Sequence, residues 1–417
     1  MKFAADVVVL GAGAAGLAAA LELARAGRSV LVLEGRERVG GRIWTREMPA
    51  LGAPVELGAE FIHGEAGVTR ALLARAGIGA VESVREQRTL ERGRLRPVNA
   101  FALARRAVEG ASLGDDVSFE RFLAARRLDE RKRRFARMMV QGFDAADPRR
   151  VSARSILDEW GEAGSLGASQ PRPRGGYGAL SGWLAHQVLR QGAHLQLQAV
   201  VQAVHWRRGR VSLHGRFLGA PFVARTRRVV VTLPLGVLRE QGVRFVPALR
   251  EKEAPLAGLA SGPVIRVAMR FPRPFWERRA PGAAFFHVPE GPFPTFWTPL
   301  PMRAPLLTAW AGGPKAARLA GRSPHALLDA ALTSVRAVFR DAGDPAAVYV
   351  QDWQSDRFSR GGYSYVLVGG GGAREALAEP LRDTLYFAGE ATDLDEAGTV
   401  AGALRSGFRA AREILSA

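Results

Sequence analysis

The N-terminal segment places a short apolar run, a cluster of glycines, an alanine-rich run and a second apolar run in close succession. Residues 6–10 and 29–33 are continuous and rich in valine and leucine, which predicts two strands buried in a parallel sheet. The alanine- and leucine-rich residues 17–26 predict a helix that ends at Gly27. Strand, glycine turn, helix and strand together form a βαβ unit, so the chain is expected to adopt an α/β fold with a Rossmann-type domain.

The turn of this unit has the glycine spacing of a dinucleotide site. Gly11 permits the tight turn, Gly13 lets the backbone approach a pyrophosphate, and Gly16 lets the helix pack close to the strand. The helix N-terminus offers free N–H groups and a positive dipole end to phosphates. Glu34 ends the second strand, where its carboxylate can accept hydrogen bonds from ribose hydroxyls. The order of these parts predicts a dinucleotide site rather than an ordinary glycine-rich turn.

Two further segments favour FAD over a nicotinamide dinucleotide. Adjacent glycines ending at Gly41 precede Arg42, and they would bring backbone and a guanidinium to the pyrophosphate. Near the C-terminus a predicted strand runs into Gly389 and Glu390, whose carboxylate can hold ribityl hydroxyls. Residues 398–415 then predict a helix whose N-terminus can stabilise the anion of a reduced flavin. The two ends of the chain are therefore expected to build one site.

These motifs resemble the flavin amine oxidase family, which includes monoamine oxidases, polyamine oxidases, lysine-specific histone demethylases and bacterial L-amino-acid oxidases. The similar stretches lie in residues 6–64, 175–182, 229–238 and 353–415, with a further one at Phe271–Trp276. The resemblance implies FAD and a Rossmann-type domain of the p-hydroxybenzoate hydroxylase-like (GR2) kind, interleaved with an α+β substrate domain. Beyond the residues already named, it implies cofactor contacts at Gly58, Ala59, Glu60, Val201, Thr399 and Val400.

The resemblance also implies roles in the substrate pocket. The family places an aromatic residue at Tyr363, beside the flavin, and Thr399 stands where monoamine oxidases have a second aromatic wall. Gly362 occupies the position of a flavin-linking cysteine in some members, so noncovalent FAD is expected. His63 matches a pocket histidine of polyamine-type members, with a structural, hydrogen-bonded histidine as the alternative. Glu60 is expected to pair with a nearby arginine or with a cationic substrate.

Arg266 is the clearest departure from the family pattern. Many members have a lysine here, which holds a water near the flavin and aids the reaction with oxygen. Arginine stays protonated and has a planar fork, so it could hold that water, bind a substrate carboxylate or slow the reaction with oxygen. The alternative is that Arg266 points to solvent or pairs with an acid.

The length of 417 residues exceeds what one core usually supports, so two interleaved domains are expected. The cofactor motifs assign the FAD-binding domain to residues 1–75, 175–250 and 354–417. The remaining residues 76–174 and 251–353 are expected to bind the substrate.

Hydrophobic patterns predict the elements within these domains. Residues 264–271 alternate and, with three short apolar runs up to residue 310, predict a mostly antiparallel sheet. Residues 99–170 predict a helical insertion and residues 324–342 a further helix. Residues 195–206 are expected to form one strand. The Gly- and Pro-rich residues from Ser165 to Gly176 are expected to link the insertion back to the FAD domain. The apolar positions of the insertion are Phe119, Phe122, Leu123, Leu128, Phe135, Met138 and Met139.

Composition narrows the environment and the partners. The absence of cysteine excludes disulfides and thiolate chemistry and fits a cytoplasmic location. The net charge of +19 comes mostly from scattered arginines, which are densest at Arg131–Arg134. We attribute this charge to the codon usage of a GC-rich, bacterial genome rather than to a nucleic-acid partner. Residues 7–21 are apolar, but their glycines oppose a signal peptide and no other run could span a membrane. No metal site stands out, and a monomer or homodimer is expected.

The function that these observations favour is oxidation of a primary or secondary amine to an imine by hydride transfer to the flavin, with O2 as the acceptor and peroxide as a product. A flavin-dependent desaturase or dehydrogenase of an apolar substrate, with another acceptor, is the alternative. A flavin-stabilised binding protein whose positive charge recruits nucleic acid or acidic lipid is a third possibility.

Overall fold

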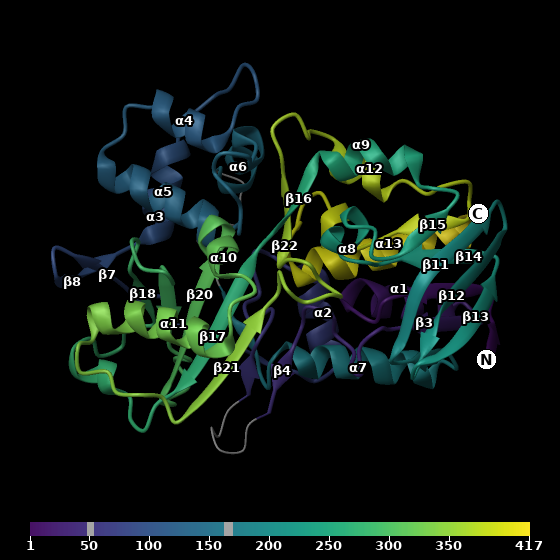
Figure 1. Ribbon diagram of the computed structural model, residues 1–417, viewed down its shortest axis with the longest axis horizontal. Coiled ribbons are helices and arrows are strands. Elements are labelled where there is room, and N and C mark those ends of the chain that lie inside the picture. The colour runs from purple at the N-terminus through teal and green to yellow at the C-terminus, as the bar shows by residue number, and fades with distance from the viewer. Residues whose placement is uncertain (48–53, 162–169) are drawn as a thin grey trace.

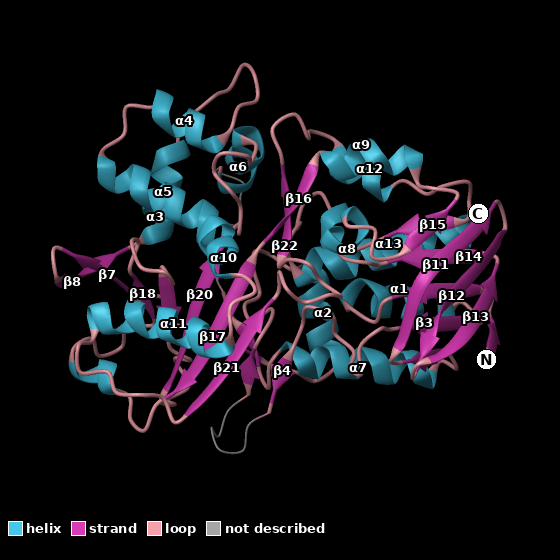
Figure 2. Ribbon diagram, in the orientation of Figure 1, coloured by secondary structure: helices cyan, strands magenta, loops and turns pink. Residues whose placement is uncertain are grey.

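The computed structural model describes residues 1–47, 54–161 and 170–417 (Figure 1). In this view the parallel-sheet part of the molecule lies on the right, a large mixed sheet on the lower left and a group of helices on the upper left (Figures 1 and 2). Both chain termini lie at the right-hand end. None of the helices in the described ranges combines the length and apolarity that crossing a bilayer requires.

The parallel sheet is built on the predicted βαβ unit. Its strand order is β10 (His194–Gln196), β3 (Val30–Leu33), β2 (Val7–Leu10), β14 (Arg228–Val231) and β23 (Leu385–Phe387), and every neighbouring pair is parallel. Val7 and Val9 face one core, whereas Val8 and Leu10 face another, so this strand is buried on both faces. The continuous apolar runs of the sequence follow from this double burial.

Helices cover one face of the parallel sheet and a second sheet covers the other. The helices are α1 (Ala14–Arg25), α7 (Tyr177–Arg190) and α13 (Val400–Ser416). The second sheet has the order β1 (Lys2–Ala4), β13 (Ala220–Thr226), β12 (Arg210–Phe217), β11 (Ala199–Arg207) and β15 (Arg244–Val246). Helices α1 and α13 pack so closely at Gly407 that a Cβ there would lie 2.2 Å from the carbonyl oxygen of Ala15.

The prediction of one strand over residues 195–206 is wrong in one respect, because these residues form two strands that belong to two different sheets. β10 extends the parallel sheet, and β11 belongs to the second sheet. Gln198 separates them with a φ of 56°, in the left-handed region that a continuous strand does not use. Its N–H donates to the carbonyl oxygen of Arg36, which fixes the turn beside the end of β3.

The large mixed sheet contains the strands predicted between residues 264 and 310. Its order is β21 (Ala347–Asp352), β17 (Val264–Arg270), β20 (Leu306–Gly312), β19 (Thr295–Trp297), β18 (Phe285–His287), β7 (Gln87–Glu91) and β8 (Arg94–Val98). All neighbouring pairs are antiparallel except β18 and β7. Helix α11 (Pro324–Val338) covers the apolar face. The β7–β8 hairpin was not expected.

Strand β17 differs from its alternating prediction because it is buried on both faces. Ile265, Val267 and Met269 pack into the core under α11. Val264 and Ala268 pack on the opposite side, against the segments around Trp353 and Leu57. The even-numbered face is therefore covered by the rest of the protein, and Arg266 lies on this face.

The helical insertion consists of α3 (Ala100–Val108), α4 (Phe119–Ala125), α5 (Glu130–Gly142) and α6 (Ala153–Trp160). Each begins at a residue whose side chain accepts a backbone N–H, as N-caps do. Six of the seven predicted apolar positions are buried, and Leu128 is half-buried. The prediction of helices from residue 99 is confirmed as far as Trp160, whereas residues 162–169, with the start of the predicted linker, lie outside the described residues.

Shorter elements connect these parts. The two-stranded sheets are β16 (Leu259–Gly262) with β22 (Tyr363–Val366), β4 (Thr45–Arg46) with β5 (Val55–Glu56), and β6 (Ala80–Val81) with β9 (Arg172–Pro173). The short helices are α2 (Gly67–Arg75), α8 (Leu235–Arg239), α9 (Glu253–Ala257), α10 (Gly313–Leu319) and α12 (Ala373–Ala378). The division into two interleaved domains stays a prediction.

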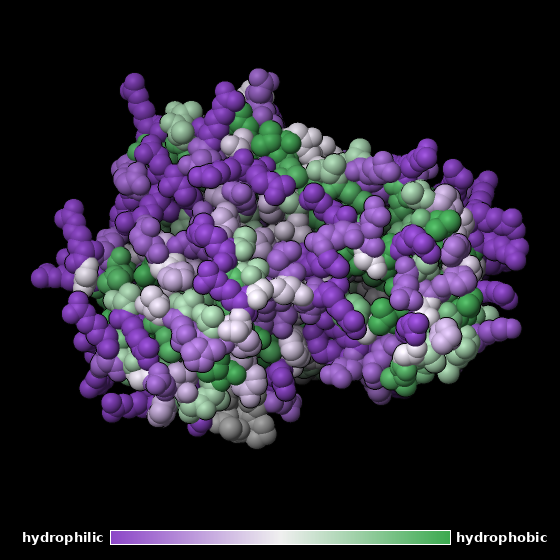
Figure 3. Space-filling view, in the orientation of Figure 1, coloured by the Kyte–Doolittle hydropathy of each residue, from purple (hydrophilic) through white to green (hydrophobic). Residues whose placement is uncertain are grey.

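The surface is strongly hydrophilic on the face shown in Figure 3, where apolar side chains are scattered rather than gathered in one patch. The dense basic cluster of α5 is paired with acids. Arg131 and Arg134 both contact Glu91, and Lys132 contacts Asp129. This cluster is therefore a solvated, salt-bridged helix face.

Candidate cofactor and substrate site

A cavity of about 2450 Å³ is lined by residues of the parallel sheet, the mixed sheet and the helical insertion. Ordinary small-molecule pockets measure about 300–1,000 Å³, so this cavity has room for a dinucleotide and a second ligand. Glu34 and Glu390, from opposite ends of the chain, both line it. All other predicted site residues also line it except Gly16.

The glycine turn before α1 shows which glycines the protein itself requires. A Cβ on Gly16 would lie 1.9 Å from the carbonyl oxygen of Gly11, and one on Gly11 would lie 2.8 Å from the hydroxyl of Thr232. A Cβ on Gly13 would meet only the carbonyl oxygen of Gly40, at 3.9 Å. Gly13 lines the cavity at the N-terminus of α1, so its missing side chain leaves space for a ligand rather than for protein atoms. This cradle fits a pyrophosphate.

Glu34 lies at the end of β3 with its carboxylate held by backbone groups. The amides of Ala12 and Arg36 donate to it at 2.8 and 2.9 Å. The amide of Ala199, at the start of β11, donates to the carbonyl oxygen of Glu34 at 2.8 Å, and Val201 of the same strand lines the cavity. The fold thus brings Glu34 and Val201 to one end of the cavity.

Arg42 and the loop after β5 pack directly on each other. A Cβ on Gly58 would lie 1.8 Å from the carbonyl oxygen of Arg42, and the amide of Ala59 donates to that oxygen at 3.2 Å. Gly41 has a φ of 60° and its Cβ position is 3.4 Å from the Cα of Gly13. These close approaches place both glycine segments and the guanidinium of Arg42 on one wall.

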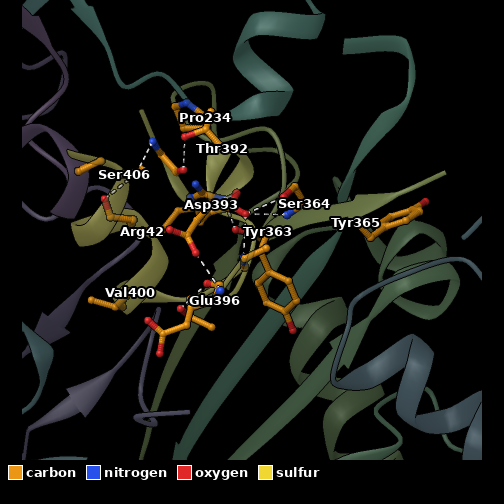
Figure 4. A pocket seen from close by; sticks show the side chains of 18 of the residues that line it. Arg42, Pro234, Tyr363, Ser364, Tyr365, Thr392, Asp393, Glu396, Val400 and Ser406 are labelled. Carbon is orange, nitrogen blue, oxygen red and sulfur yellow. Dashed lines mark hydrogen bonds and ion pairs between the residues drawn. The ribbon is translucent and has the colours of Figure 1, made fainter. Parts of the chain in front are cut away.

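Glu390 has several partners at the opposite end of the cavity. Its carboxylate accepts from Arg42 at 2.9 Å, from the Ser364 hydroxyl at 2.7 Å and from the Gly398 amide at 3.2 Å. Burial raises the pKa of Glu390, but the guanidiniums of Arg42 and Arg374 outweigh that effect, so the pKa lies below its usual value. Arg42 and Ser364 lie close together in Figure 4, with Tyr363 beside them. Gly389, which precedes this carboxylate, also lines the cavity.

Thr399 is the N-cap of α13. Its hydroxyl accepts from the amide of Gly402 at 3.0 Å and donates to the carbonyl oxygen of Glu396 at 2.6 Å. Val400 begins the helix and, like Thr399, lines the cavity. The positive end of the helix dipole therefore lies at the cavity wall, where it favours negative charge.

His63 and Tyr363 both contact Phe143, which caps the C-terminal end of α5. The His63 ring packs edge-on against Phe143 with the ring centroids 5.3 Å apart, and the Tyr363 hydroxyl donates to the carbonyl oxygen of Phe143. Burial lowers the pKa of His63 to about 4, so this imidazole is neutral at neutral pH. Its Nδ1 lies 3.5 Å from the Gln170 amide nitrogen. Burial also raises the pKa of Tyr363 well above its usual value, which keeps the hydroxyl protonated.

Arg266 projects from β17 into a buried ion cluster. It pairs with Glu60 and donates to the carbonyl oxygen of Gly58 at 2.9 Å, and Arg172 donates to the same Glu60 carboxylate at 2.6 Å. Burial raises the pKa of Glu60, but Arg266 and Arg172 lower it by more, so the carboxylate is ionised. The Nε of Arg266 is buried and has no hydrogen-bond partner among the described residues. The Arg266 side chain therefore keeps a buried N–H donor without a partner at the cavity wall.

Aromatic side chains complete the wall near Glu60. The Trp297 indole N–H lies 3.2 Å from the Glu60 carboxylate, and its ring centroid is 5.8 Å from that of Phe61. The Trp310 indole donates to the carbonyl oxygen of Gly142 at 2.8 Å, and that of Trp353 donates to Leu57 at 2.9 Å. All three tryptophans line the cavity, each with its polar atom bonded to protein.

Sequence reasoning missed several charged residues in or beside the site, among them Arg172, Asp144 and Glu159. Arg172 was hidden in a Gly- and Pro-rich stretch, and nothing local links it to Glu60. Asp144 and Glu159 also line the cavity, at the ends of α5 and α6. An acid directly after an apolar helical run was the available signal for Asp144. In the described ranges, no group of histidine and acidic side chains has the arrangement of a metal site.

Comparison with known proteins identifies similar chains. Residues 14–415 match the model of the family described as flavin containing amine oxidoreductase. Over 98% of its length the chain is 30% identical to lysine-specific histone demethylase 1 homolog 2 of Arabidopsis thaliana and 27% identical to lysine-specific histone demethylase 2 of Homo sapiens. It spans 58% and 53% of these two relatives, little more than half of each.

Solved structures share the whole fold. Putrescine oxidase bound to putrescine superimposes with a TM-score of 0.83 and 23% identity over 100% of both chains. Cyclohexylamine oxidase from Brevibacterium oxydans IH-35A gives a TM-score of 0.81 and 23% identity over 99% of both. At this level of identity the similarity establishes the α/β architecture with its parallel and mixed sheets.

Proposed function

This chain belongs to the flavin-containing amine oxidoreductase family, and we propose that it binds FAD noncovalently and oxidises a primary or secondary amine to an imine, with O2 as the electron acceptor. The observation that carries the proposal is the single cavity to which Glu34, Arg42, Glu390 and Tyr363 all contribute. In this proposal FAD supplies the acceptor for the hydride equivalent that leaves the carbon next to the substrate nitrogen.

The residues of the cavity fit FAD from end to end. We assign Glu34 and Val201 to the adenosine end and the cradle at Gly13 to the pyrophosphate, with Gly11, Gly16 and Gly41 shaping that cradle and Arg42 beside it. Glu390 and Gly389 are assigned to the ribityl chain. Thr399 and Val400 are assigned to the flavin pyrimidine, because the N-terminus of α13 favours developing negative charge there. Gly58, Ala59 and Glu60 line the remaining wall.

The noncovalent form is supported by Gly362. A Cβ at this position would lie 2.6 Å from the Cγ2 atom of Val264. The backbone here is packed too tightly for a side chain that could reach the cofactor, and the chain has no cysteine. The cytoplasmic location stays a prediction of the sequence.

The substrate part of the cavity can bind and orient an amine and remove its hydration water. The Trp297, Trp310 and Phe61 rings form apolar walls, and a neutral His63 adds no positive charge that would repel an ammonium. Tyr363 is assigned to the position beside the reacting nitrogen. Arg266 is assigned to the flavin side of the wall, where its free Nε can donate a hydrogen bond. The putrescine bound by one structural relative is consistent with a small aliphatic amine as substrate.

The test uses the purified full chain. FAD should be visible in the absorption spectrum and should leave the protein on acid precipitation. Under anaerobic conditions at least one member of a panel of monoamines, diamines, polyamines and amino acids should bleach the flavin, and admission of air should restore the colour with release of peroxide. A colourless protein that takes up no FAD, or flavin inert to the whole panel, would overturn the proposal.

A further inference from the structure

Two acidic side chains at the cavity, Asp144 and Glu159, form no salt bridge with any of the described residues. Asp144 is 6% exposed, and neither of its carboxylate oxygens has a hydrogen-bond partner among the described residues. Glu159 is exposed and lines the same cavity. Burial raises the pKa of Asp144, and the neighbouring Glu159 carboxyl raises it further. Burial also raises the pKa of Glu159, partly offset by Arg374. The two carboxyls therefore share a site and together favour retaining one proton.

The other buried acids of the site are satisfied. Glu60 has two guanidiniums, Glu390 has Arg42, and Glu34 has two backbone amides. Among the described residues, Arg374 is the cation that acts on Glu159, and its guanidinium donates to the Ser364 hydroxyl and to two carbonyl oxygens. In a chain with a net charge of +19, an acid pair left without its own cation is unusual.

Both acids also stand where helices end. Asp144 follows the last turn of α5, and Glu159 lies in the last turn of α6. Neither helix has a basic residue in its last turn to offset the dipole. The C-terminal end of a helix dipole is negative and favours a cation. The two helix ends and the two acids thus all favour a bound cation at this place in the cavity.

The acid pair lies on the Tyr363 side of the cavity. The Tyr363 hydroxyl donates to Phe143, the residue before Asp144, and both acids raise the pKa of that hydroxyl. The proposed function places the reacting amine at Tyr363. A second cationic group on the same substrate would therefore reach the pair, whereas an apolar tail would leave the Asp144 carboxyl buried and unpaired.

We propose that Asp144 and Glu159 form a cation subsite for the distal ammonium of a substrate with two or more amino groups, such as an α,ω-diamine or a polyamine. This inference rests on the proposed amine oxidation, since that function fixes which end of the substrate lies at Tyr363.

The experiment compares 1,4-diaminobutane with butylamine, which lacks only the second amino group. In the holoenzyme the diamine should have a kcat/KM at least about tenfold higher, the discrimination that about 1.4 kcal/mol of differential binding gives. D144N and E159Q should each reduce that ratio to near unity. D158N is the matched control, because Asp158 is the exposed acid preceding Glu159 and lines the same cavity; it should keep the ratio.

A diamine preference that survives in both D144N and E159Q, or that D158N removes equally, would overturn the subsite. Anaerobic calorimetric titration of the holoenzyme with the same two amines separates this failure from failure of the proposed function. If neither amine is oxidised, tighter binding of the diamine that is lost in D144N still supports the subsite, and equal binding of the two amines excludes it. Because D144N removes a buried carboxyl without partners, the variant should fold, and thermal unfolding verifies this.

Discussion

Arg266 and Glu60 form an ion pair from which water is almost excluded, with side-chain exposures of 2% and 9%. Glu60 also accepts a hydrogen bond from Arg172, so one carboxylate serves two guanidiniums and the cluster keeps a net positive charge. Arg266 therefore pairs with an acid and does not point to solvent, while its role toward the flavin, the substrate or oxygen stays a prediction. Its consequences for the flavin can be measured.

Arg266→Met should make the flavin harder to reduce. The variant removes a buried positive charge but leaves Glu60 paired with Arg172, so the protein should still fold. The midpoint potential should fall by tens of millivolts, with about 30 mV for each 1.4 kcal/mol of lost stabilisation of the reduced form. Spectroelectrochemical titration measures it. Arg278→Met, which removes an exposed arginine paired with Asp341, is the control, and equal potentials in all three proteins would refute the role of Arg266.

Gly13→Ala should abolish or strongly weaken FAD binding without unfolding the protein. The new Cβ meets only a carbonyl oxygen at 3.9 Å, so the apoprotein tolerates it, but the methyl group would fill the space assigned to the pyrophosphate. The ratio of flavin to protein absorbance in the purified variant is the measurement. Gly182→Ala, in the middle of α7 with no atom within 4 Å of the Cβ, is the matched control and should add up to about 1 kcal/mol of stability. Full flavin content in Gly13→Ala would contradict the assignment.

Thr399→Ala should lower the free energy of unfolding by about 1 kcal/mol, because α13 loses the side chain that accepts the Gly402 amide. Thr399→Ser keeps an oxygen at the same place and should unfold like the wild type. Urea denaturation of the apoproteins separates the two. If alanine and serine at this position behave alike, the cap contributes little and Thr399 acts only through the ligand.

Glu56 should make the free energy of unfolding fall as the pH rises from about 5 to about 8. Burial raises its pKa to about 7 from a usual value of 4.5, so the folded state prefers the protonated form. The stabilisation is complete below the unfolded pKa and is lost as the pH rises through the folded value, amounting to about 2–3 kcal/mol between pH 5 and pH 8. Glu56→Gln should therefore gain stability relative to wild type over this interval in denaturation titrations. The exposed Glu109→Gln should show no such gain, and a pH-independent difference for Glu56→Gln would refute the linkage.

Local signals predicted the parallel sheet well because each of its parts is specified within a few residues. Burial of Val7–Leu10 on both faces requires a continuous apolar run, and the close approach of α1 to the turn requires a glycine at position 16. The split between β10 and β11 could not be predicted, because it depends on a single left-handed residue, Gln198, held by a contact with Arg36.

The substrate part of the site was less predictable because its geometry depends on distant pairings. Arg172 and Glu60 are far apart in sequence and meet only when β9 and the loop after β5 are both in place. Asp144 and Glu159 are ordinary acids in the sequence, and their isolation from any cation of their own appears only after α5 and α6 end at the same cavity. The β7–β8 hairpin joins its sheet through the parallel pairing with β18, which no local pattern specifies.

The order in which the sheet strands occur along the chain has a consequence for biosynthesis. Strand β23, which pairs with β14, and the carboxylate of Glu390 are translated long after the glycine turn, Glu34 and β14. A nascent chain that already contains the glycine turn and Glu34 therefore has only one end of its ligand site, with an edge strand of the sheet still unpaired. The full set of proposed flavin ligands is thus present only after residues 385–390 have been made, and until then β14 is an edge strand open to pairing with another chain.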